Sequence, residues 1–422
     1  MDKKKERQCA GVPFHAADTY IARLIEKGYK VAICEQLEDP KQAKGIVKRG
    51  VIRVVTPGTV IESNLLDEKK NNYIMAIYKN GTYFGVSVCD ISTGDFRTTQ
   101  ITETNNFPKL LDEISRYNPA EIIVNPFMYD SQEEIATIKE RFEVYISRVK
   151  EEAFQKEETT LTQKYTFLDD HGQPIEDITE KRMAIYSIHG LLEYLVETQK
   201  TKLDHINKII LYHTTKYMAL DISARRNLEI TEKMRDKSKK GTLLWVLDKT
   251  CTSMGGRLLR RWLNDPLIDV YEINKRLEAV KELKQDIMLR GETITALKKV
   301  YDMERLAGRI AYGNATGRDM ISLKNSVKQL PEVKKVLTNT KADFLQELYQ
   351  ELDELTDIYE LIEEAIVDEP PMSIKEGGLI KLGYNEEIDH LKQATTQGKT
   401  WLVELEAKER EQTRNKRTKS RI

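Results

Sequence analysis

The chain has 422 residues, of which 40% are hydrophobic and 32% charged, and its formal net charge is −1. This length predicts two to four domains of roughly 100–200 residues, with enough apolar material for their cores. A small nucleic-acid-binding domain is usually basic overall, so the near-neutral balance excludes that simple case. It leaves open local basic patches on a long multidomain chain.

The composition also bears on cellular location and on metals. The sequence has no run of about 18 apolar residues, which a membrane span requires, and no apolar stretch follows its charged N-terminus. Its four cysteines are far apart, at Cys9, Cys34, Cys89 and Cys251. A zinc site needs convergent Cys and His ligands, so we expect reduced thiols, no metal site and a cytoplasmic protein.

The first structural unit lies between residues 10 and 58. Apolar residues recur there at the spacing of one helix face, at Tyr20, Ile21, Leu24 and Ile25. Gly28 follows as a candidate helix C-cap, and two strands are predicted in YKVAIC and GVIRVV. One helix and two strands cannot close a core alone, so we interpret this unit as the back half of a mixed α/β domain.

Residues 73–148 carry a clearer pattern. Strands predicted in NYIMAIY and TYFGVSVCD are joined by Asn80-Gly81, the strongest short hairpin signal, and a third strand follows the turn STG. A helix from Phe107 to Tyr117, the buried strand AEIIVN, another helix and the strand FEVYISRV come next. Three antiparallel strands followed by this alternation describe an RNase-H-like α/β domain.

From about Thr179 onward the sequence predicts helices. Apolar stripes run through IHGLLEYLVETQ and LTDIYELIEEAIV. Between them, two Trp residues and helix caps at Thr242 and at Thr252 or Ser253 indicate a packed joint between helices. From residue 384 to 411, apolar residues repeat every seven positions, which is typical of a coiled-coil arm.

Two short motifs raise the question of catalysis. Gly398-Lys399-Thr400 matches the end of a phosphate-binding P-loop, but that motif requires a glycine after a strand where Gln393 stands in a helical pattern. Asp90 and Asp95 flank a turn and could hold Mg²⁺, although Asp in a turn commonly binds nearby backbone instead. We expect neither a nucleotide site nor nuclease activity from these residues.

Basic residues gather at two places in the helical part. Arg257, Arg260 and Arg261 share one predicted helix face, and Arg225-Arg226 is a second basic pair. They could contact phosphates. Because the segment is also rich in Glu and Asp, we interpret them as partners in ion pairs. The histidines are scattered and form no catalytic arrangement.

Longer motifs carry a family resemblance. They are CAGVPFHAADTYIARLIEKGYKVAICEQLEDP, AKGIVKRGVIRVVTPGT, DISTGDF, RRNLEI, TLLWVLDKTCTSMGGRLLRRWLNDPL, DMERLAGRIAYG and KEGGLIKLGYNEEID. In this order, from about residue 9 to residue 411, they closely resemble the bacterial MutS family of DNA mismatch-recognition proteins.

The resemblance implies a multidomain fold, α/β followed by all-α. The expected parts are a partial mismatch-binding domain at residues 1–62, an RNase-H-like connector at 65–176, a helical core or lever at 179–382, the start of a clamp arm at 383–411 and an off-family basic tail at 412–422. In the family, a Phe-x-Glu motif wedges its Phe beside the mispaired base. The sequence has no Phe-x-Glu, and Phe14 is followed by His15-Ala16.

The family pattern also continues into a clamp and a P-loop ATPase, which uses ATP and Mg²⁺. The last residues, QTRNKRTKSRI, depart from that pattern. We therefore interpret the sequence as a fragment, ended by a shifted reading frame or an early stop, with no cofactor of its own.

Candidate DNA-binding residues come from the first unit, and they are Gly11, Pro13, His15, Lys48 and Arg53. The resemblance implies mismatched double-stranded DNA, a MutL-like repair partner and a second copy of the chain as partners, no membrane, and a nucleoid-associated place in the bacterial cytoplasm. Three activities stay open: a DNA-binding repair protein, an ATPase, and an interaction module acting through the connector.

Overall fold

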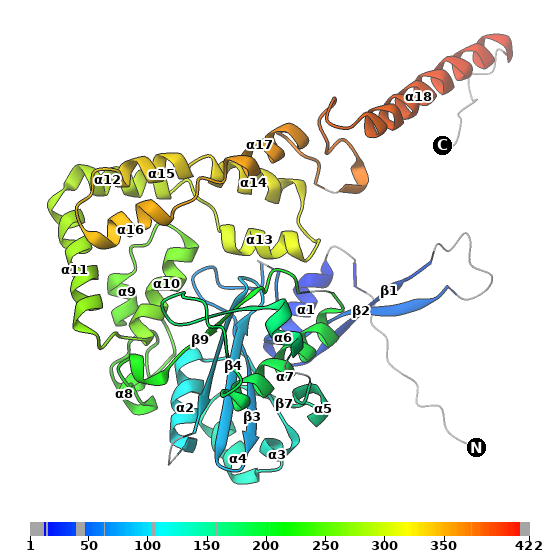
Figure 1. Ribbon diagram of the computed structural model, residues 1–422. Helices are drawn as coiled ribbons and strands as arrows, with labels where there is room; N and C mark the ends of the chain where they lie inside the picture. The colour runs from blue at the N-terminus through cyan, green and yellow to red at the C-terminus, as the bar shows by residue number, and fades with distance from the viewer. Residues whose placement is uncertain are drawn as a thin grey trace, which may run out of the picture. The chain divides into compact units, whose positions relative to one another are not determined.

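The computed structural model describes residues 12–13, 16–38, 47–62, 64–102, 106–156, 159–201, 203–372 and 374–413 (Figure 1). The chain forms two compact units. The first comprises Met1–Ala315 and Glu332–Leu352, and the second comprises Thr316–Pro331 and Asp353–Ile422. None of the helices in these described ranges is long and apolar enough to span a membrane.

The first unit opens with one helix and an antiparallel strand pair. These elements are α1 (Ala17–Glu26), β1 (Val31–Gln36) and β2 (Arg49–Val55). Gly28 follows the helix with a φ of +76°, as expected of a left-handed turn. Ile25 is buried against Val55 in a small core, whereas Tyr20 and Leu24 are 45% and 42% exposed. Only half of the predicted apolar helix face is therefore buried.

Glu121 joins these opening elements to the sheet that follows them. Its fully buried carboxylate accepts hydrogen bonds from the hydroxyls of Thr56 at 2.5 Å, Tyr194 at 2.7 Å and Ser147 at 3.1 Å. The Nζ of Lys30 lies 3.3 Å from the same carboxylate. The opening elements are thus attached to the sheet through a buried polar network.

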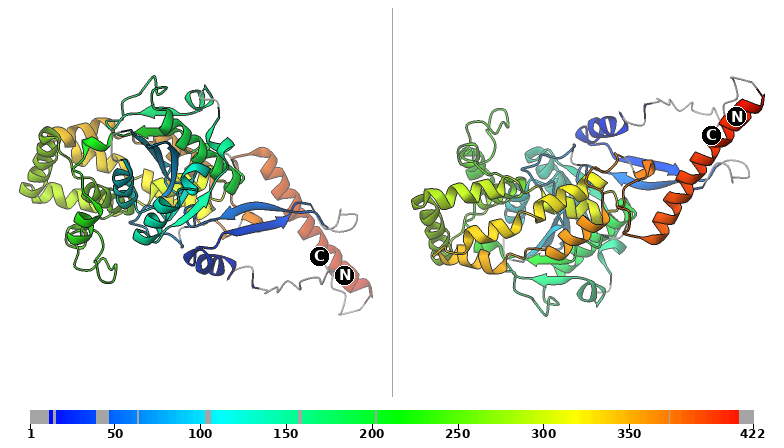
Figure 2. Two further views of the ribbon diagram at one scale, coloured as in Figure 1. Left: turned by 90° about the horizontal axis from the view of Figure 1, so that it is seen from below. Right: turned by 90° about the horizontal axis from the view of Figure 1, so that it is seen from above.

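A seven-stranded mixed sheet forms the centre of the first unit (Figures 1 and 2). Its strands are β3 (Ile74–Asn80), β4 (Tyr83–Asp90), β5 (Asp95–Ile101), β6 (Glu121–Val124), β7 (Tyr145–Arg148), β8 (Thr166–Leu168) and β9 (Lys208–Leu211). Their order is β7-β6-β3-β4-β5-β9-β8. The β3–β4–β5 ladder is antiparallel and the other pairings are parallel, and Asn80 pairs with Tyr83 at the predicted hairpin.

Helices cover both faces of this sheet and close two hydrophobic cores. The covering helices are α2 (Asn106–Tyr117), α3 (Pro126–Tyr129) and α4 (Gln132–Arg141) on one face, and α5 (Glu151–Phe154), α6 (Thr159–Lys164) and α7 (Arg182–Gln199) on the other. Along β3, Met75 and Ile77 join the first core, whereas Ile74 and Ala76 join the second. This alternation follows from the two-residue period of a strand that is buried on both faces.

The sheet domain, residues 72–212, extends beyond the boundary expected from the sequence. Helix α7 packs on β3 and β4, and β9 adds a strand parallel to β5. Helix α7 and strand β9 thus pack with the sheet, although the expected connector ends at residue 176 and the expected helical part begins at 179; as domain boundaries both stay predictions. The apolar stripe with Ile188 and Leu191 is buried against the sheet. Helical periodicity reveals a buried face but not its partner, so it does not distinguish a helix packed on a sheet from one in a helical core.

The helices after the sheet complete the first unit. They are α8 (Ile222–Asn227), α9 (Leu243–Leu247), α10 (Ser253–Asn264), α11 (Val270–Gln285), α12 (Ile287–Leu297), α13 (Met303–Ala311) and α16 (Asp343–Glu351), while α15 (Leu330–Leu337) crosses the unit boundary. Two predicted caps are confirmed, since the hydroxyl of Thr242 accepts from Trp245 N at 3.1 Å and that of Thr252 from Gly255 N at 3.0 Å.

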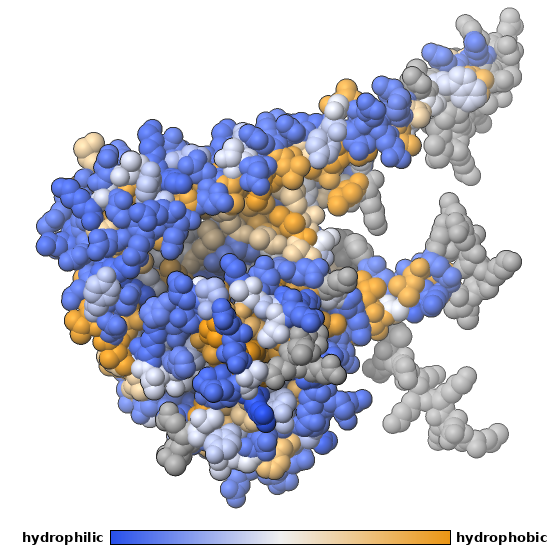
Figure 3. Space-filling model, viewed as in Figure 1, coloured by the Kyte–Doolittle hydropathy of each residue, from blue (hydrophilic) through white to orange (hydrophobic). Residues whose placement is uncertain are grey.

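The surface of the first unit is mostly polar. Hydrophilic side chains cover most of its visible face in the space-filling view (Figure 3). Helix α9 is an exception, because only Leu244 is buried, while Leu243, Trp245, Val246 and Leu247 are 46–56% exposed. The predicted joint is therefore packed on one side and open on the other.

The second unit pairs two short helices and carries a long one. Its helices are α14 (Gly317–Val327), α17 (Thr356–Ala365) and α18 (Glu386–Thr413). The Nζ of Lys324 on α14 donates to Glu363 at 2.7 Å and Asp368 at 3.0 Å. The helix predicted for this segment is confirmed, since α18 is one helix of 28 residues, and residues 398–400 lie inside it. Its role as a coiled-coil arm stays a prediction. The basic tail from residue 414 lies outside the described residues.

Candidate functional site

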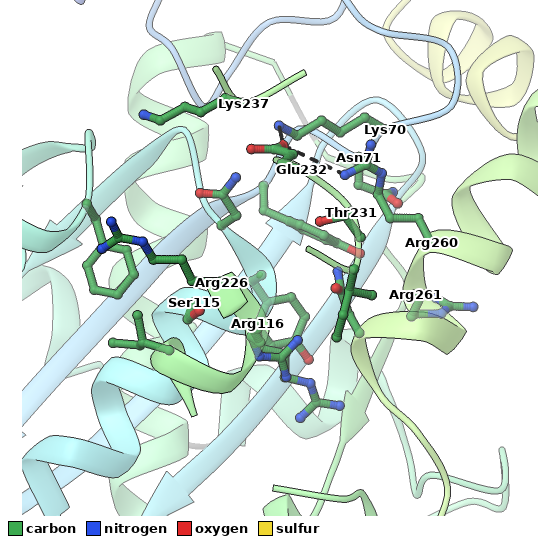
Figure 4. Close-up of a pocket in the computed structure, with 18 of the residues that line it drawn as sticks. Lys70, Asn71, Ser115, Arg116, Arg226, Thr231, Glu232, Lys237, Arg260 and Arg261 are labelled. Atoms are coloured by element: carbon green, nitrogen blue, oxygen red, sulfur yellow. Dashed lines mark hydrogen bonds and ion pairs between the residues drawn. The ribbon is translucent and has the colours of Figure 1, made fainter. Parts of the chain in front are cut away.

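A cavity of about 400 Å³, which we call the arginine cavity, opens between the sheet domain and the helices that follow it (Figure 4). Its wall comes from the ends of α2 and α4, from the chain just before β3, from α8 and the loop after it, and from α10. All these segments belong to the first unit. Ten of the lining residues are Lys or Arg, and only Glu232 and Asp265 are acidic.

Arg116, at the end of α2, is buried in this wall and only 7% exposed. Its Nε donates to Asp265 at 2.6 Å, and its Nη1 lies 3.4 Å from Glu113. The guanidinium also lies 4.9 Å from the ring centre of Tyr212 and 4.7 Å from that of Tyr217. Its Nη2 is buried and has no hydrogen-bond partner among the described residues. One donor of this fixed cation is therefore unused.

The predicted ion-pair role is confirmed for two arginines of α10, Arg257 and Arg261. Arg257 donates to both carboxylate oxygens of Asp302, at 2.6 and 2.7 Å, and to Glu304 at 2.6 Å. Arg261 lies 3.5 Å from Asp95. The carboxylates come from α13, from the residue before it and from β5, so these pairs fasten α10 to its neighbours.

Two other guanidinium groups in the wall are poorly compensated. Arg260 has Glu232 at 3.9 Å, but Lys70 lies closer to that carboxylate, at 3.4 Å. Arg225 donates through Nε to the carbonyl of Leu220 at 3.0 Å. Burial lowers the pKa of both arginines below the ordinary value. The Nη1 of Arg225 and the Nε of Arg260 are buried without a hydrogen-bond partner in the described part of the chain.

The convergence of these cations is what the sequence does not reveal. The basic pair at residues 225–226 and the three arginines at 257–261 stand out in the sequence, but Arg116 stands alone, more than a hundred residues earlier. The fold brings α2, α8 and α10 to one cavity (Figure 4). No local motif marks Arg116 as a member of this set.

The predicted DNA-binding residues lie elsewhere, in the opening elements. Gly11 and His15 are outside the described residues. Pro13 is exposed, and so is Lys48, whose backbone N–H donates to Glu38 at 2.6 Å. The side chains of Pro13 and Lys48 are thus open to solvent, and their DNA-binding role stays a prediction.

Arg53 has a different setting, because its guanidinium is bound within the protein. It donates to Glu62 at 2.5 Å, to Gln199 on α7 at 3.0 Å and to the carbonyl of Thr59 at 3.2 Å. Through these contacts, Arg53 links β2 to the sheet domain. Contact with DNA stays a prediction for Arg53 and would have to compete with them.

The two aspartates weighed as metal ligands serve the local fold. Asp90 is buried and accepts from the side chain of Asn71 at 2.8 Å, and burial raises its pKa. Asp95 accepts from the hydroxyl of Tyr73 at 2.9 Å. Burial alone would raise the pKa of Asp95, but Arg97 and other cations bring it below the usual value. The described residues contain no cluster of three metal-ligating side chains.

Three family models match consecutive parts of the chain. MutS domain I matches residues 1–64, MutS domain II matches 72–207 and MutS domain III matches 223–417. The second range contains most of the sheet domain, including α7.

Curated relatives agree with these models. The DNA mismatch repair protein MutS of Acetivibrio thermocellus is 52% identical over 405 residues, which are 96% of this chain and 46% of the relative. The protein of the same name from Ruminiclostridium cellulolyticum is 52% identical over 404 residues, with the same coverage. That of Alkaliphilus oremlandii is 47% identical over 410 residues. The chain spans about half the length of these relatives, and it belongs to the MutS family.

Proposed function

We propose that this chain serves the mismatch-recognition step of DNA repair, as part of a MutS-type protein that binds mismatched double-stranded DNA. The observation that carries this proposal is the match of three MutS domains, in order, to residues 1–64, 72–207 and 223–417. We place the protein in the bacterial cytoplasm, near the nucleoid, as a homodimer that works with a MutL-like partner.

The finer fold assignment belongs to the same proposal. The sheet domain is an RNase-H-like connector, which its order β7-β6-β3-β4-β5-β9-β8 supports through an antiparallel centre with parallel strands beside it. The helices from α8 to α17 are part of a lever, and α18 is the start of a clamp arm.

ATP hydrolysis is not part of the proposal for these 422 residues. No Gly-x-x-x-x-Gly-Lys-Ser/Thr occurs in the sequence, and the partial match at residues 398–400 lies in α18. ATP and Mg²⁺ are proposed as ligands of the family's full-length form.

Direct binding to DNA tests the proposal. An aromatic wedge reads how easily a mispaired step unstacks, and no Phe-x-Glu occurs in the sequence. We therefore expect weak binding without mismatch preference, driven by interactions with phosphates. About four such interactions would give a log–log salt slope of roughly −3.6. Fluorescence anisotropy with a G·T duplex and a matched duplex, titrated with salt, measures both quantities.

The basic tail provides a control within that experiment. Deleting residues 412–422 should reduce the magnitude of the slope by about one for each phosphate that the tail neutralises. A chain that binds neither duplex at low salt would contradict the proposal. A G·T preference that persists at physiological salt would show that the chain reads mismatches without the Phe-x-Glu motif.

A second candidate function is an interaction module. The sheet domain has two closed cores, so it can present a folded surface to a MutL-like partner without the rest of a MutS protein. A pull-down with residues 72–212 alone separates this function from DNA binding. Capture of the partner by this fragment, with no DNA present, is the expected result.

A further inference from the structure

We propose that the arginine cavity is a binding site for the terminal phosphate group of a small molecule. The first argument is charge. Ten cationic side chains line the cavity against two carboxylates; carboxylates outside the lining pair with Arg116, Arg257 and Arg261, but within the described residues no ion pair involves Arg141, Arg225, Arg226 or Lys233. A cavity so unbalanced favours an anionic occupant.

The second argument is the set of unused donors. Arg225 and Arg260 line the cavity and leave guanidinium donors unused: in the described part of the chain Arg225 donates only through Nε, to Leu220, and the carboxylate of Glu232 lies 3.9 Å from Arg260. Buried donors are almost always satisfied in folded proteins, so each unused one requires an explanation. An oxygen-rich anion inside the cavity would accept from them.

The number of donors and their charge indicate which anion fits. A terminal phosphate presents three acceptor oxygens and carries close to two negative charges at neutral pH. A carboxylate presents two oxygens and one charge, and it would leave more of the cavity uncompensated. Guanidinium groups also match phosphate geometry, because their N–H groups lie in one plane at a fixed spacing.

The shape of the cavity favours a small molecule over a duplex. Its volume of about 400 Å³ lies in the range of small-ligand sites. A phosphodiester within a duplex carries a sugar on either side and cannot offer three free oxygens to the guanidinium groups of the cavity. Neutral parts of the wall come from Tyr117, Phe142 and Met234, which give space for the remainder of a larger ligand.

The test uses the full chain with two probes, inorganic pyrophosphate and ADP, by isothermal titration calorimetry at low ionic strength. We expect saturable binding of pyrophosphate with one site per chain. Arg225→Gln and Arg260→Gln should each weaken it at least tenfold. The matched control is Arg148→Gln, which also removes one positive charge from a side chain that is 54% exposed and outside the cavity. It should change the affinity less than twofold.

Thermal unfolding separates ligand binding from a structural role. Without ligand, Arg225→Gln should melt at or slightly above the wild-type midpoint, because it removes an uncompensated buried cation. With pyrophosphate, the wild type should gain several degrees and this variant should not. If Arg225→Gln fails to fold, Arg260→Gln serves for the same comparison. Arg260 is also weakly compensated, because the carboxylate of Glu232 lies 3.9 Å from its guanidinium.

The two probes identify the source of the phosphate. Equal affinity for pyrophosphate and ADP supports a site for the phosphate alone. Tighter binding of ADP supports a nucleotide whose base uses the neutral wall, and would revise the expectation, drawn from the missing P-loop, that the chain binds no nucleotide. The proposal is overturned if neither probe binds, if both cavity variants bind like the wild type, or if matched duplex DNA displaces pyrophosphate. None of these outcomes depends on mismatch recognition.

Discussion

At the residue scale, burial decides which ion pairs matter. The side chain of Arg257 is 3% exposed and bridges Asp302 and Glu304. The pair formed by Lys335 and Glu332 spans 3.9 Å, with both side chains more than 60% exposed. Removing one partner of a buried pair strands the other charge, whereas an exposed pair is solvated with or without its partner.

The first prediction compares these two pairs. Arg257→Met should lower the free energy of unfolding by about 2–3 kcal/mol, less than for a fully enclosed pair because Asp302 and Glu304 keep some contact with water. Lys335→Met should change it by under about 0.5 kcal/mol. Urea denaturation followed by circular dichroism measures both, and similar losses for the two variants would contradict the argument.

The second prediction concerns His189 on α7, which is buried. Burial, with Lys156 nearby, lowers its pKa from 6.5 to about 4. The folded state therefore binds fewer protons than the unfolded state between these values, so its stability falls as the pH drops from about 6.5 to about 4. His189→Gln lacks this dependence. Relative to the variant, the wild type should lose up to about 2 kcal/mol over that range. Parallel curves of stability against pH would show that the residue does not titrate as described.

At the element scale, the contact between α7 and β4 requires a residue without a side chain. A Cβ on Gly85 would lie 1.7 Å from the carbonyl oxygen of Met183, so the start of the helix rests directly on the strand. The third prediction is that Gly85→Ala lowers stability by about 3 kcal/mol or more, because backbone must move to admit the methyl group. Thermal and urea denaturation measure the loss.

Gly291 in α12 provides the matched control. A Cβ there meets nothing within 4 Å, and the residue lies in a helix. Gly291→Ala should therefore raise stability by about 0.5–1 kcal/mol, through the lower backbone entropy of the unfolded chain. The same substitution should thus have opposite signs at two glycines of one protein. Loss of stability at Gly291 would mean that α12 makes a contact there that the structure does not show.

The sequence is a good guide to single elements and a poor one to their partners. The hairpin at Asn80-Gly81 and the caps at Thr242 and Thr252 were predictable because each depends on residues a few positions apart. The placement of α7 was not, because its apolar stripe would suit a helical core as well as a sheet. The arginine cavity was hidden for the same reason, since its cations come from separate elements.

At the scale of the whole molecule, the parts of the first unit differ in how much core they contain. The opening elements share a small cluster around Ile25, Val55 and Val60, whereas the sheet domain has a large core on each face. Regions with little buried apolar surface open at lower free energy.

The fourth prediction follows from that difference. In limited proteolysis, cuts within residues 17–62 should appear before cuts within residues 72–212, and the latter should persist as a resistant fragment. Mass spectrometry of samples taken over a time course identifies the early cuts and the resistant fragment. Equal rates of cleavage in the two regions would show that attachment through Glu121 makes the opening elements as stable as the sheet domain.

That attachment also has a consequence for the order of events during synthesis. Lys30 and Thr56 leave the ribosome before the residues that complete the network. Glu121 follows Thr56 by 65 residues, and Tyr194 follows Glu121 by another 73. At about 5–20 residues per second, the opening elements wait on the order of 10 s before they can be anchored. During that interval the apolar side of α1 and both edges of its strand pair are available to chaperones. A pause in translation before Tyr194 would lengthen this exposure, and one after it would not.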